Sequence, residues 1–226
     1  MLKKFLTTLF QKKNDNEEQS EGNFIIAQLN EKVGPIDRGL VYEDPLDEFL
    51  KEKQYGEVTG GGTLQENTGE LSYCDIEIEL RTKAIDKSTI SDIILMLENL
   101  GAPKGSKLII ESTKEEIPFG KKEGLALYLD GQGLPEEVYR ECDINFVISE
   151  IHRLTNIEPD ADRNWQGEKE IALYFFNNSF VEMKSSISDF IEKYPYVRVL
   201  ELFRLHNDNL TCCQHELCRN LNESNN

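Results

Sequence analysis

The segment that decides the fold runs from residue 71 to residue 80 and reads LSYCDIEIEL. Apolar side chains occupy alternate positions, Cys74, Ile76, Ile78 and Leu80, and Tyr73, Asp75, Glu77 and Glu79 fill the positions between them. Successive side chains of a strand point to opposite faces of its sheet. The alternation therefore predicts a half-buried antiparallel strand with an acidic outer face.

The residues around this strand predict an alternation of strands and helices. A short apolar run at residues 39–42 favours a strand, and Asp44 followed by Pro45 is typical of a capped helix start. A short strand at 55–59, a helix at 88–100 and a strand at 107–111 complete the first half. The predicted order of this half is strand, helix, strand, strand, helix, strand.

The second half repeats this order. The expected elements are strands at 124–129, 164–167, 170–176 and 196–203, with a helix capped by Asp143 and another opened by Ser179. We therefore predict an α+β fold of two tandem βαββαβ ferredoxin-like units with antiparallel sheets, at residues 36–113 and 122–204. The alternative is a single mixed α+β domain with one continuous sheet.

The two ends have a different composition from the centre. Residues 1–13 form a basic amphipathic segment, residues 14–35 read as an acidic linker, and residues 205–226 form a polar tail that contains cysteine and histidine. Residues 2–13 could lie on an anionic membrane surface or dock on a partner. Docking on the protein's own acidic surface or fraying is the favoured interpretation, because one short helix binds membranes weakly.

The charge balance narrows the classes of partner. The formal net charge is −17 over 226 residues, which argues against nucleic acid, because phosphate binding needs a basic surface. An acidic chain of this kind suits a solubilising surface or a basic protein partner. Five irregularly spaced cysteines do not form a disulfide framework, so a reduced, cytoplasmic setting is expected.

The densest run of glycine is the first candidate binding segment, formed by Gly60, Gly61, Gly62 and Thr63. Phosphate-binding loops place such glycines before a helix, whereas here a strand follows and no Gly-Lys-Ser/Thr ending is present. The favoured interpretation is a hairpin turn or a bulge. Close approach of a partner or ligand backbone is the alternative.

Each of the other candidate residues has a structural interpretation beside the functional one. Asp75, Glu77 and Glu79 could form a binding surface, although an acidic sheet face is first a solvated face. Trp165, the sole tryptophan, is either a binding anchor or a lid over the second core. His152 is expected to be a surface or packed side chain rather than a base.

The tail supplies the residue types that bind zinc: Cys212, Cys213, His215 and Cys218. Their spacing differs from that of paired Cys-x-x-Cys sites, so a polar chain end is the favoured interpretation and metal binding stays open. No catalytic constellation is present in the sequence, and we predict neither a metal site nor a cofactor.

Several segments resemble a bacterial family that has no assigned chemistry. They are residues 56–63, 100–108, 123–131, 134–139 and 165–167, within a region that extends over about residues 36–203. The family is one of tandem α+β, ferredoxin-like proteins, and it is similar to the immunity proteins of bacterial toxin systems, which neutralise a toxin by binding it. The resemblance carries over no active-site residues.

The leading functional hypothesis is a non-enzymatic protein-binding module, such as an immunity-type inhibitor of a basic toxin. Opposite charges would speed its encounter with that partner. The candidate contacts are the glycine segment, the acidic strand and Trp165. The alternative is a regulatory sensor that holds a small molecule between its two units, and an enzyme is the third hypothesis. The sequence leaves the oligomeric state open.

Overall fold

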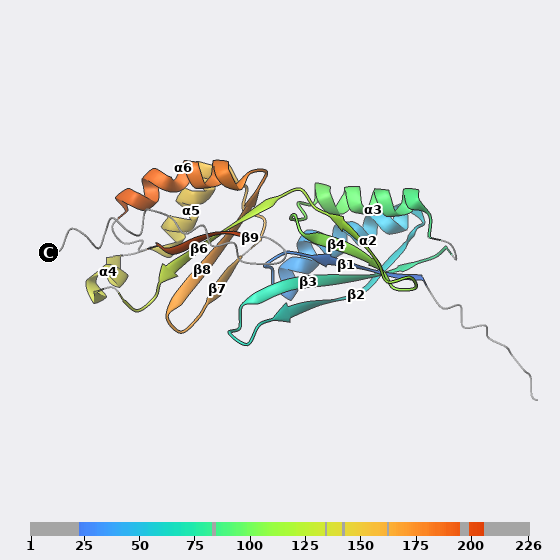
Figure 1. The fold of residues 1–226 in the computed structure, drawn as a ribbon, viewed down its shortest axis with the longest axis horizontal. Helices are drawn as coiled ribbons and strands as arrows, with labels where there is room; N and C mark the ends of the chain where they lie inside the picture. Colours follow the sequence, from blue (N-terminus) through green and yellow to red (C-terminus); the bar gives the residue numbers. More distant parts are fainter. Residues whose placement is uncertain are drawn as a thin grey trace, which may run out of the picture.

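The protein has an α+β fold with two antiparallel sheets (Figure 1). The structure, a computed structural model, describes residues 23–82, 85–133, 135–141, 143–161, 163–194 and 199–205. No helix in these ranges is long and apolar enough to span a membrane. The basic segment at residues 1–13 and the predicted zinc-ligand types Cys212, Cys213, His215 and Cys218 lie outside the described residues.

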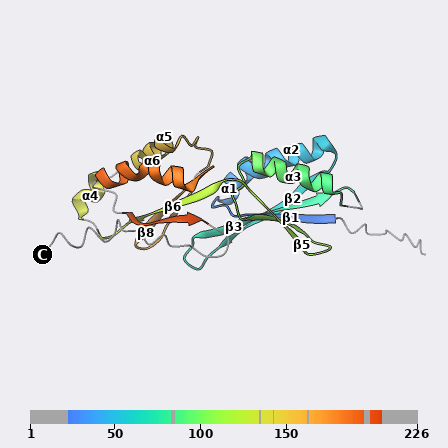
Figure 2. The ribbon, with the colours of Figure 1, turned by 45° about the horizontal axis from the view of Figure 1, so that its top comes forward.

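The first sheet has five strands in the order β2-β3-β1-β4-β5. Their bounds are β1 Asn23–Leu29, β2 Gly56–Gln65, β3 Leu71–Leu80, β4 Ser106–Ile110 and β5 Glu115–Phe119. We call this sheet and the helical segments that pack on it the first unit, and the second sheet with its helices the second unit. The helical segments of the first unit are α1 Pro35–Arg38, the π-helical turn η1 Gly39–Glu43, α2 Asp44–Lys53 and α3 Lys87–Asn99. The helices α2 and α3 lie on the same face of the sheet (Figure 2).

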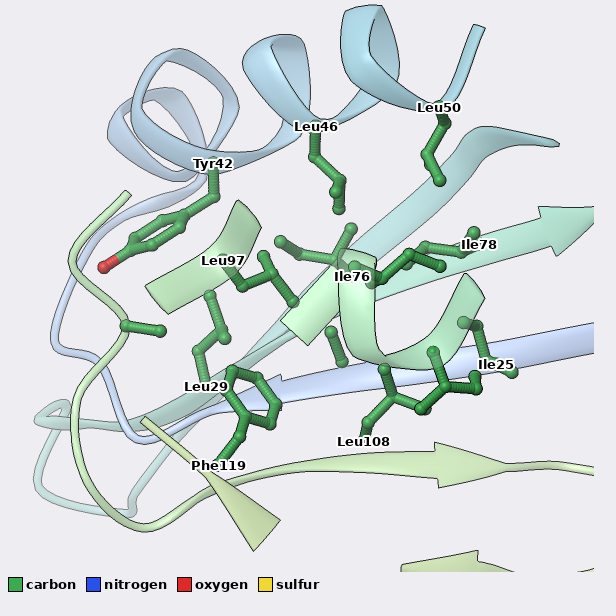
Figure 3. Packing of buried hydrophobic residues seen from close by; sticks show 14 of the residues in the cluster. Ile25, Leu29, Tyr42, Leu46, Leu50, Ile76, Ile78, Leu97, Leu108 and Phe119 are labelled. Atoms are coloured by element: carbon green, nitrogen blue, oxygen red, sulfur yellow. The ribbon is translucent and has the colours of Figure 1, made fainter. Parts of the chain in front are cut away.

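The core of the first unit lies between the sheet and these helices. Ile76 and Ile78 of β3 and Leu46 of α2 are completely buried and pack in one cluster (Figure 3). Cys74 is also fully buried and Leu80 is nearly so, as the alternation of the sequence predicts. Each fully buried side chain of this size contributes about 1.5–3 kcal/mol relative to exposure, so this face of β3 anchors the unit.

The second sheet has four strands in the order β7-β8-β6-β9. Their bounds are β6 Glu123–Asp130, β7 Asn164–Gln166, β8 Glu170–Asn177 and β9 Val199–Leu205. The helices are α4 Glu136–Glu141, α5 Ile144–Thr155 and α6 Phe180–Lys193. Leu125 and Leu127 of β6 pack with Val147 and Ile151 of α5 and Ile187 of α6, and all five are fully buried.

Side-chain caps start three of the helices. The carboxylate of Asp86 accepts a hydrogen bond from Ser88 N at 3.1 Å, and that of Asp143 accepts one from Asn145 N at 2.9 Å. The hydroxyl of Ser179 accepts one from Glu182 N at 3.3 Å. These bonds satisfy backbone donors that have no partner within the helix. The predicted starts at Asp143 and Ser179 are confirmed.

Two predictions for the beginning of the chain are wrong. Residues 23–29 of the predicted linker form β1, which pairs with both β3 and β4. Residues 39–42 are helical rather than extended, because Pro35 starts a helix that continues through Glu43. Leu40 is 64 % exposed and Tyr42 is fully buried, although a strand would place both on one face. Asp44 therefore lies within a helix and does not cap one.

The glycine segment is not a hairpin turn. Gly60, Gly61, Gly62 and Thr63 lie within the edge strand β2, and the pairing with β3 shifts by one residue between Val58 and Gly60. The bulge that was one part of the expectation is therefore present. The turn follows at residues 66–70, where Gly69 has a φ of 88°.

Two further elements, in addition to β1, have no counterpart in the sequence prediction. The strand β5 extends the first sheet beyond residue 113, and α4 precedes α5 in the second unit. The two sheets remain separate, so the alternative of one continuous sheet is wrong.

The backbone at Gly61 leaves no room for a side chain. A Cβ atom there would lie 2.6 Å from Glu43 Oε1 and 2.7 Å from the Asp75 carbonyl oxygen, whereas one at Gly62 would meet nothing within 4 Å. We expect Gly61→Ala to lower the free energy of unfolding by about 1–3 kcal/mol. Gly62→Ala, the matched control, should change it by less than about 1 kcal/mol. Urea denaturation of both variants checks this, and equal effects would contradict it.

Candidate functional site

The predicted acidic residues project from the face of the first sheet that is opposite the helices. Asp75, Glu77 and Glu79 alternate with the buried residues of β3, so their side chains leave the sheet on the other side. In Figure 2 the helices lie above this sheet and none lies below it. Glu77 is exposed, and Asp75 and Glu79 are half-buried.

Strand register places further residues on this face. Glu57 of β2 lies directly opposite Glu79, and on the other side of β3 Phe24 lies opposite Glu79 and Ile26 opposite Glu77. Ile26 in turn lies opposite Ile109 of β4. We call this surface the acidic face and define it by Phe24, Ile26, Glu57, Asp75, Glu77, Glu79 and Ile109. It combines half-buried apolar side chains at the centre with a carboxylate row along one side.

The carboxylates of this row have no close cation among the described residues, although the charge of Lys51 attracts Glu57. Among the described residues no lysine or arginine forms a salt bridge with Glu57, Glu77 or Glu79. Asp75 accepts a hydrogen bond from the Gln28 amide at 3.1 Å. Like charges directly opposite each other, such as Glu57 and Glu79, destabilise a sheet. The acidic face therefore holds negative charge at a cost to the fold.

The glycine segment borders the acidic face but has a structural role of its own. Gly60 and Gly62 lie opposite Glu77 and Asp75. On the helix side, Thr63 Oγ1 accepts a hydrogen bond from Arg38 Nη1 at 2.7 Å, and Arg38 also forms an ion pair with Glu43. A side chain at Gly61 would collide with this ion pair.

Trp165 lies away from the acidic face. It belongs to β7, is half-buried, and packs against the small cluster formed by Ala126, Tyr128, Ala172 and Tyr174. Its indole Nε1 donates to the carbonyl oxygen of Thr68, in the turn between β2 and β3, at 3.2 Å. The tryptophan thus forms a contact between the two units.

A second cluster that the sequence did not predict joins the units through buried charges. The carboxylate of Glu31, which is fully buried, accepts hydrogen bonds from Arg163 Nε at 3.1 Å and Arg163 Nη2 at 3.3 Å. It also accepts from Tyr42 OH and Lys32 N, both at 2.8 Å. Arg163 Nη1 donates to Asp160 at 2.5 Å. Burial alone would lower the pKa of Arg163, but the Glu31 and Asp160 carboxylates outweigh it and raise this pKa.

A second carboxylate, Glu70, lies in the turn after β2 and contacts the second sheet. Its Oε1 accepts hydrogen bonds from Tyr174 OH at 2.6 Å and Tyr128 OH at 3.0 Å. Lys32 Nζ lies 3.7 Å from the same oxygen and 5.6 Å from the centre of the Tyr174 ring. Burial lowers the pKa of Lys32, although Glu70 acts in the opposite direction. The hydrogen bonds of Glu70 and the contact of Lys32 with the Tyr174 ring tie loops of the first unit to the second sheet, on the face that carries Tyr128 and Tyr174.

A cavity of about 370 Å³ lies beside this junction. Its walls come from the strand β8, the end of α5 and the loop at residues 156–161. Gly101 of the first unit and Lys122 of the connection between the units also line it. His152 lines it, and its Nδ1 lies 3.0 Å from the Ile157 carbonyl oxygen, so this histidine is packed against its own loop. None of the predicted glycine residues lines this cavity.

The described residues offer few reactive groups. Burial raises the pKa of the Cys74 thiol, which makes it a poor nucleophile. No three histidine, cysteine, aspartate or glutamate residues in the described ranges lie close enough together to hold a metal ion.

Comparisons with known proteins add little. No family model matches the chain, and no curated protein matches it. A solved structure described as "Putative Chlorite dismutase" is 10 % identical to this protein, with a TM-score of 0.23. The match covers 75 % of this chain and 86 % of the other chain. A likeness this low gives no information on fold or activity.

Breaking the Glu31–Arg163 pair should be costly. Glu31→Gln or Arg163→Met leaves the other charge buried without a full partner, so we expect each to lower the free energy of unfolding by about 3–5 kcal/mol. The double variant should lose less than the sum of the two. Lys193→Met, which removes an exposed pair with Asp189, is the control and should change stability by less than about 0.5 kcal/mol. Additive losses in urea denaturation would contradict the direct coupling of the pair.

The junction tyrosines should make the fold sensitive to alkali. Burial, reinforced by Glu31, raises the pKa of Tyr42. Burial and the Glu70 carboxylate raise those of Tyr128 and Tyr174. In the unfolded chain these groups lose their protons near pH ~10. Above that pH the folded state binds more protons than the unfolded state, so the free energy of unfolding should fall as the pH rises.

Tyrosinate absorbance measured during titration checks this expectation. The native protein should ionise fewer of its eight tyrosines at pH ~10 than the urea-unfolded chain does. Identical titration curves for the native and unfolded protein would contradict it.

Proposed function

We propose that this protein is a non-enzymatic binding module whose acidic face docks on a basic protein. The observation that carries the proposal is the row of Glu57, Asp75, Glu77 and Glu79, which faces solvent without salt bridges from the described residues. Half-buried apolar residues beside the row, Phe24, Ile26 and Ile109, would supply the central contact area of an interface.

The charge of the face selects the class of partner. A second copy of this chain is disfavoured, because two acidic rows would face each other, and nucleic acid is disfavoured for the same reason. A basic protein would neutralise the row, and the net charge of −17 would speed the encounter. An immunity-type inhibitor that covers a basic toxin fits this chemistry, and we propose it as the specific role, in the cytoplasm.

We also infer that the two sheets are tandem ferredoxin-like units. The strand orders β2-β3-β1-β4 and β7-β8-β6-β9 follow the same pattern when each set of strands is numbered from its first. On this view β5 is an addition to the first unit. If the units arose by duplication, each sheet has one face that its own helices leave open. On the second sheet this face contacts the first unit at the junction, and on the first sheet it is the acidic face, which is left for a partner.

A regulatory sensor is the second candidate function. The cavity beside the junction favours it, because its lining comes mainly from the second unit and also includes Gly101 and Lys122. A ligand there would contact both sides of the junction.

Charge neutralisation tests the docking proposal. The variant Asp75→Asn, Glu77→Gln, Glu79→Gln removes three charges from the acidic face. The variant Glu48→Gln, Glu52→Gln, Glu192→Gln removes three exposed charges from helices and is the matched control. Both carry the same net charge, so a difference between them reports the face and not the overall field.

The measurement is crosslinking and affinity capture from the native host at low and high salt, followed by titration of the purified partner. We expect the wild type and the control to bind one basic protein, and the face variant to bind it at least about tenfold more weakly. A partner that is acidic, or one that the face variant retains with full affinity, would sink the proposal. Failure of the wild type to retain any protein would do the same.

A further inference from the structure

The cavity beside the junction is lined by a stretch of strand edge that has no neighbouring strand among the described residues. Among the described residues the strand β7 pairs with β8 at residues 171–173, and the last backbone hydrogen bond along that edge runs from Tyr174 N to the Arg163 carbonyl oxygen at 3.0 Å. The strand β8 continues to Asn177, and Leu173, Phe175 and Phe176 line the cavity. Figure 1 shows β7 alongside β8.

Phe176 is the residue of this edge that lies beyond the pairing with β7 and lines the cavity. Backbone groups of a strand alternate in direction, so the N–H and C=O of Phe176 point to the same side as those of Tyr174. On the side of β8 that faces β7, no strand of the described residues pairs with Phe176, and no hydrogen bond from a described loop or turn reaches either of its backbone groups. Unpaired backbone groups in a partly buried position favour a ligand that supplies both an acceptor and a donor.

We call the charged side chains that line the cavity its rim. One positive and one negative group of the rim are not part of the salt bridges of Arg163. Arg163 is neutralised by Glu31 and Asp160. Lys122 and Glu158 are the other charged residues of the lining. Lys122 Nζ uses one of its three donors on Asn178, at 2.9 Å, and Glu158 has no salt bridge in the described part of the chain. A ligand with one positive and one negative group matches this rim.

The remaining lining is apolar. Leu173 and Phe175 are nearly fully buried beneath the cavity, and Ile148 and Ile157 also line it. The volume of about 370 Å³ is at the small end of the usual range for ligand sites, which is about 300–1,000 Å³. This size suits a single small molecule.

We propose that the cavity binds a free α-amino acid with an apolar side chain. Its carboxylate lies between the Phe176 N–H and the Lys122 ammonium, and its ammonium group lies between the Phe176 C=O and the Glu158 carboxylate. Its side chain packs over Phe175. This assignment rests on the second candidate function, the sensor, and names its class of ligand; it is independent of docking at the acidic face.

Isothermal titration calorimetry on the full chain tests the ligand class. The probes are L-leucine, 3-methylbutylamine, which lacks the carboxylate, and 4-methylpentanoate, which lacks the ammonium group. We expect L-leucine to bind, and each of the other two to bind at least about tenfold more weakly, because each leaves one charged group of the rim without its partner. The amide resonance of Phe176 should shift on addition of L-leucine.

Variants separate the two ends of the ligand. Glu158→Gln should weaken L-leucine by about tenfold and leave 4-methylpentanoate unchanged, whereas Lys122→Met should weaken L-leucine and leave 3-methylbutylamine unchanged. Glu168→Gln, an exposed change outside the cavity, is the control. Circular dichroism verifies that each variant is folded.

Several results would overturn the assignment. They are absence of L-leucine binding at millimolar concentration, equal affinity for all three probes, or binding that leaves the Phe176 amide unchanged. If L-leucine fails and a different metabolite shifts the Phe176 amide, the ligand class is wrong and the sensor function stands. If no metabolite of a broad panel binds, both are wrong.

Discussion

The fully buried carboxylate of Glu31 is the constraint on which the arrangement of the two units depends. A carboxylate without solvent must be surrounded by donors, because the cost of burying a bare charge is far larger than the stability of a domain. The first unit supplies Tyr42 OH and Lys32 N, and the second supplies the guanidinium of Arg163, which is 132 residues away in sequence. The first unit therefore has a buried charge that the second unit neutralises through the guanidinium of Arg163.

Other contacts at the junction act in the same direction. Glu70 accepts hydrogen bonds from two tyrosines of the second sheet, and Trp165 bonds to the turn that carries Glu70. The short connection after β5 is also held close to the first unit, since Lys104 N donates to Lys122 O at 2.7 Å. Together these bonds fix the position of Arg163 and Lys122, and with them the walls of the cavity.

The sequence allowed much of the fold to be predicted where one local pattern dominated. The alternation in residues 71–80 located β3 and its acidic face, and Asp143 and Ser179 located two helix starts. The pattern failed at residues 39–42, where an apolar run suits either a strand or a helix, and the buried Tyr42 with the exposed Leu40 reveals the helical period only in the structure. The strand β1 was hidden because its polar neighbours made the whole stretch look like a linker.

Of the candidate site, the sequence could predict the carboxylates but not their surroundings. Phe24 and Ile26 join the acidic face through strand register, which depends on pairing between residues far apart in the chain. The Glu31–Arg163 pair and the open edge at Phe176 are also products of tertiary structure, and neither has a local signature. The glycine segment is the opposite case. The sequence shows its high glycine content, but the need for glycine at position 61 comes from Arg38 and Glu43, which pack over it.

The central claim is that the buried charges make the two units one cooperative structure. Native-state hydrogen exchange at increasing urea concentration tests it most directly, by comparing the amides of β1 with those of β6. The account predicts that the most protected amides of both strands exchange with the same opening free energy and the same dependence on urea. If β6 opens at a clearly lower free energy than β1, the units unfold independently and the claim is contradicted.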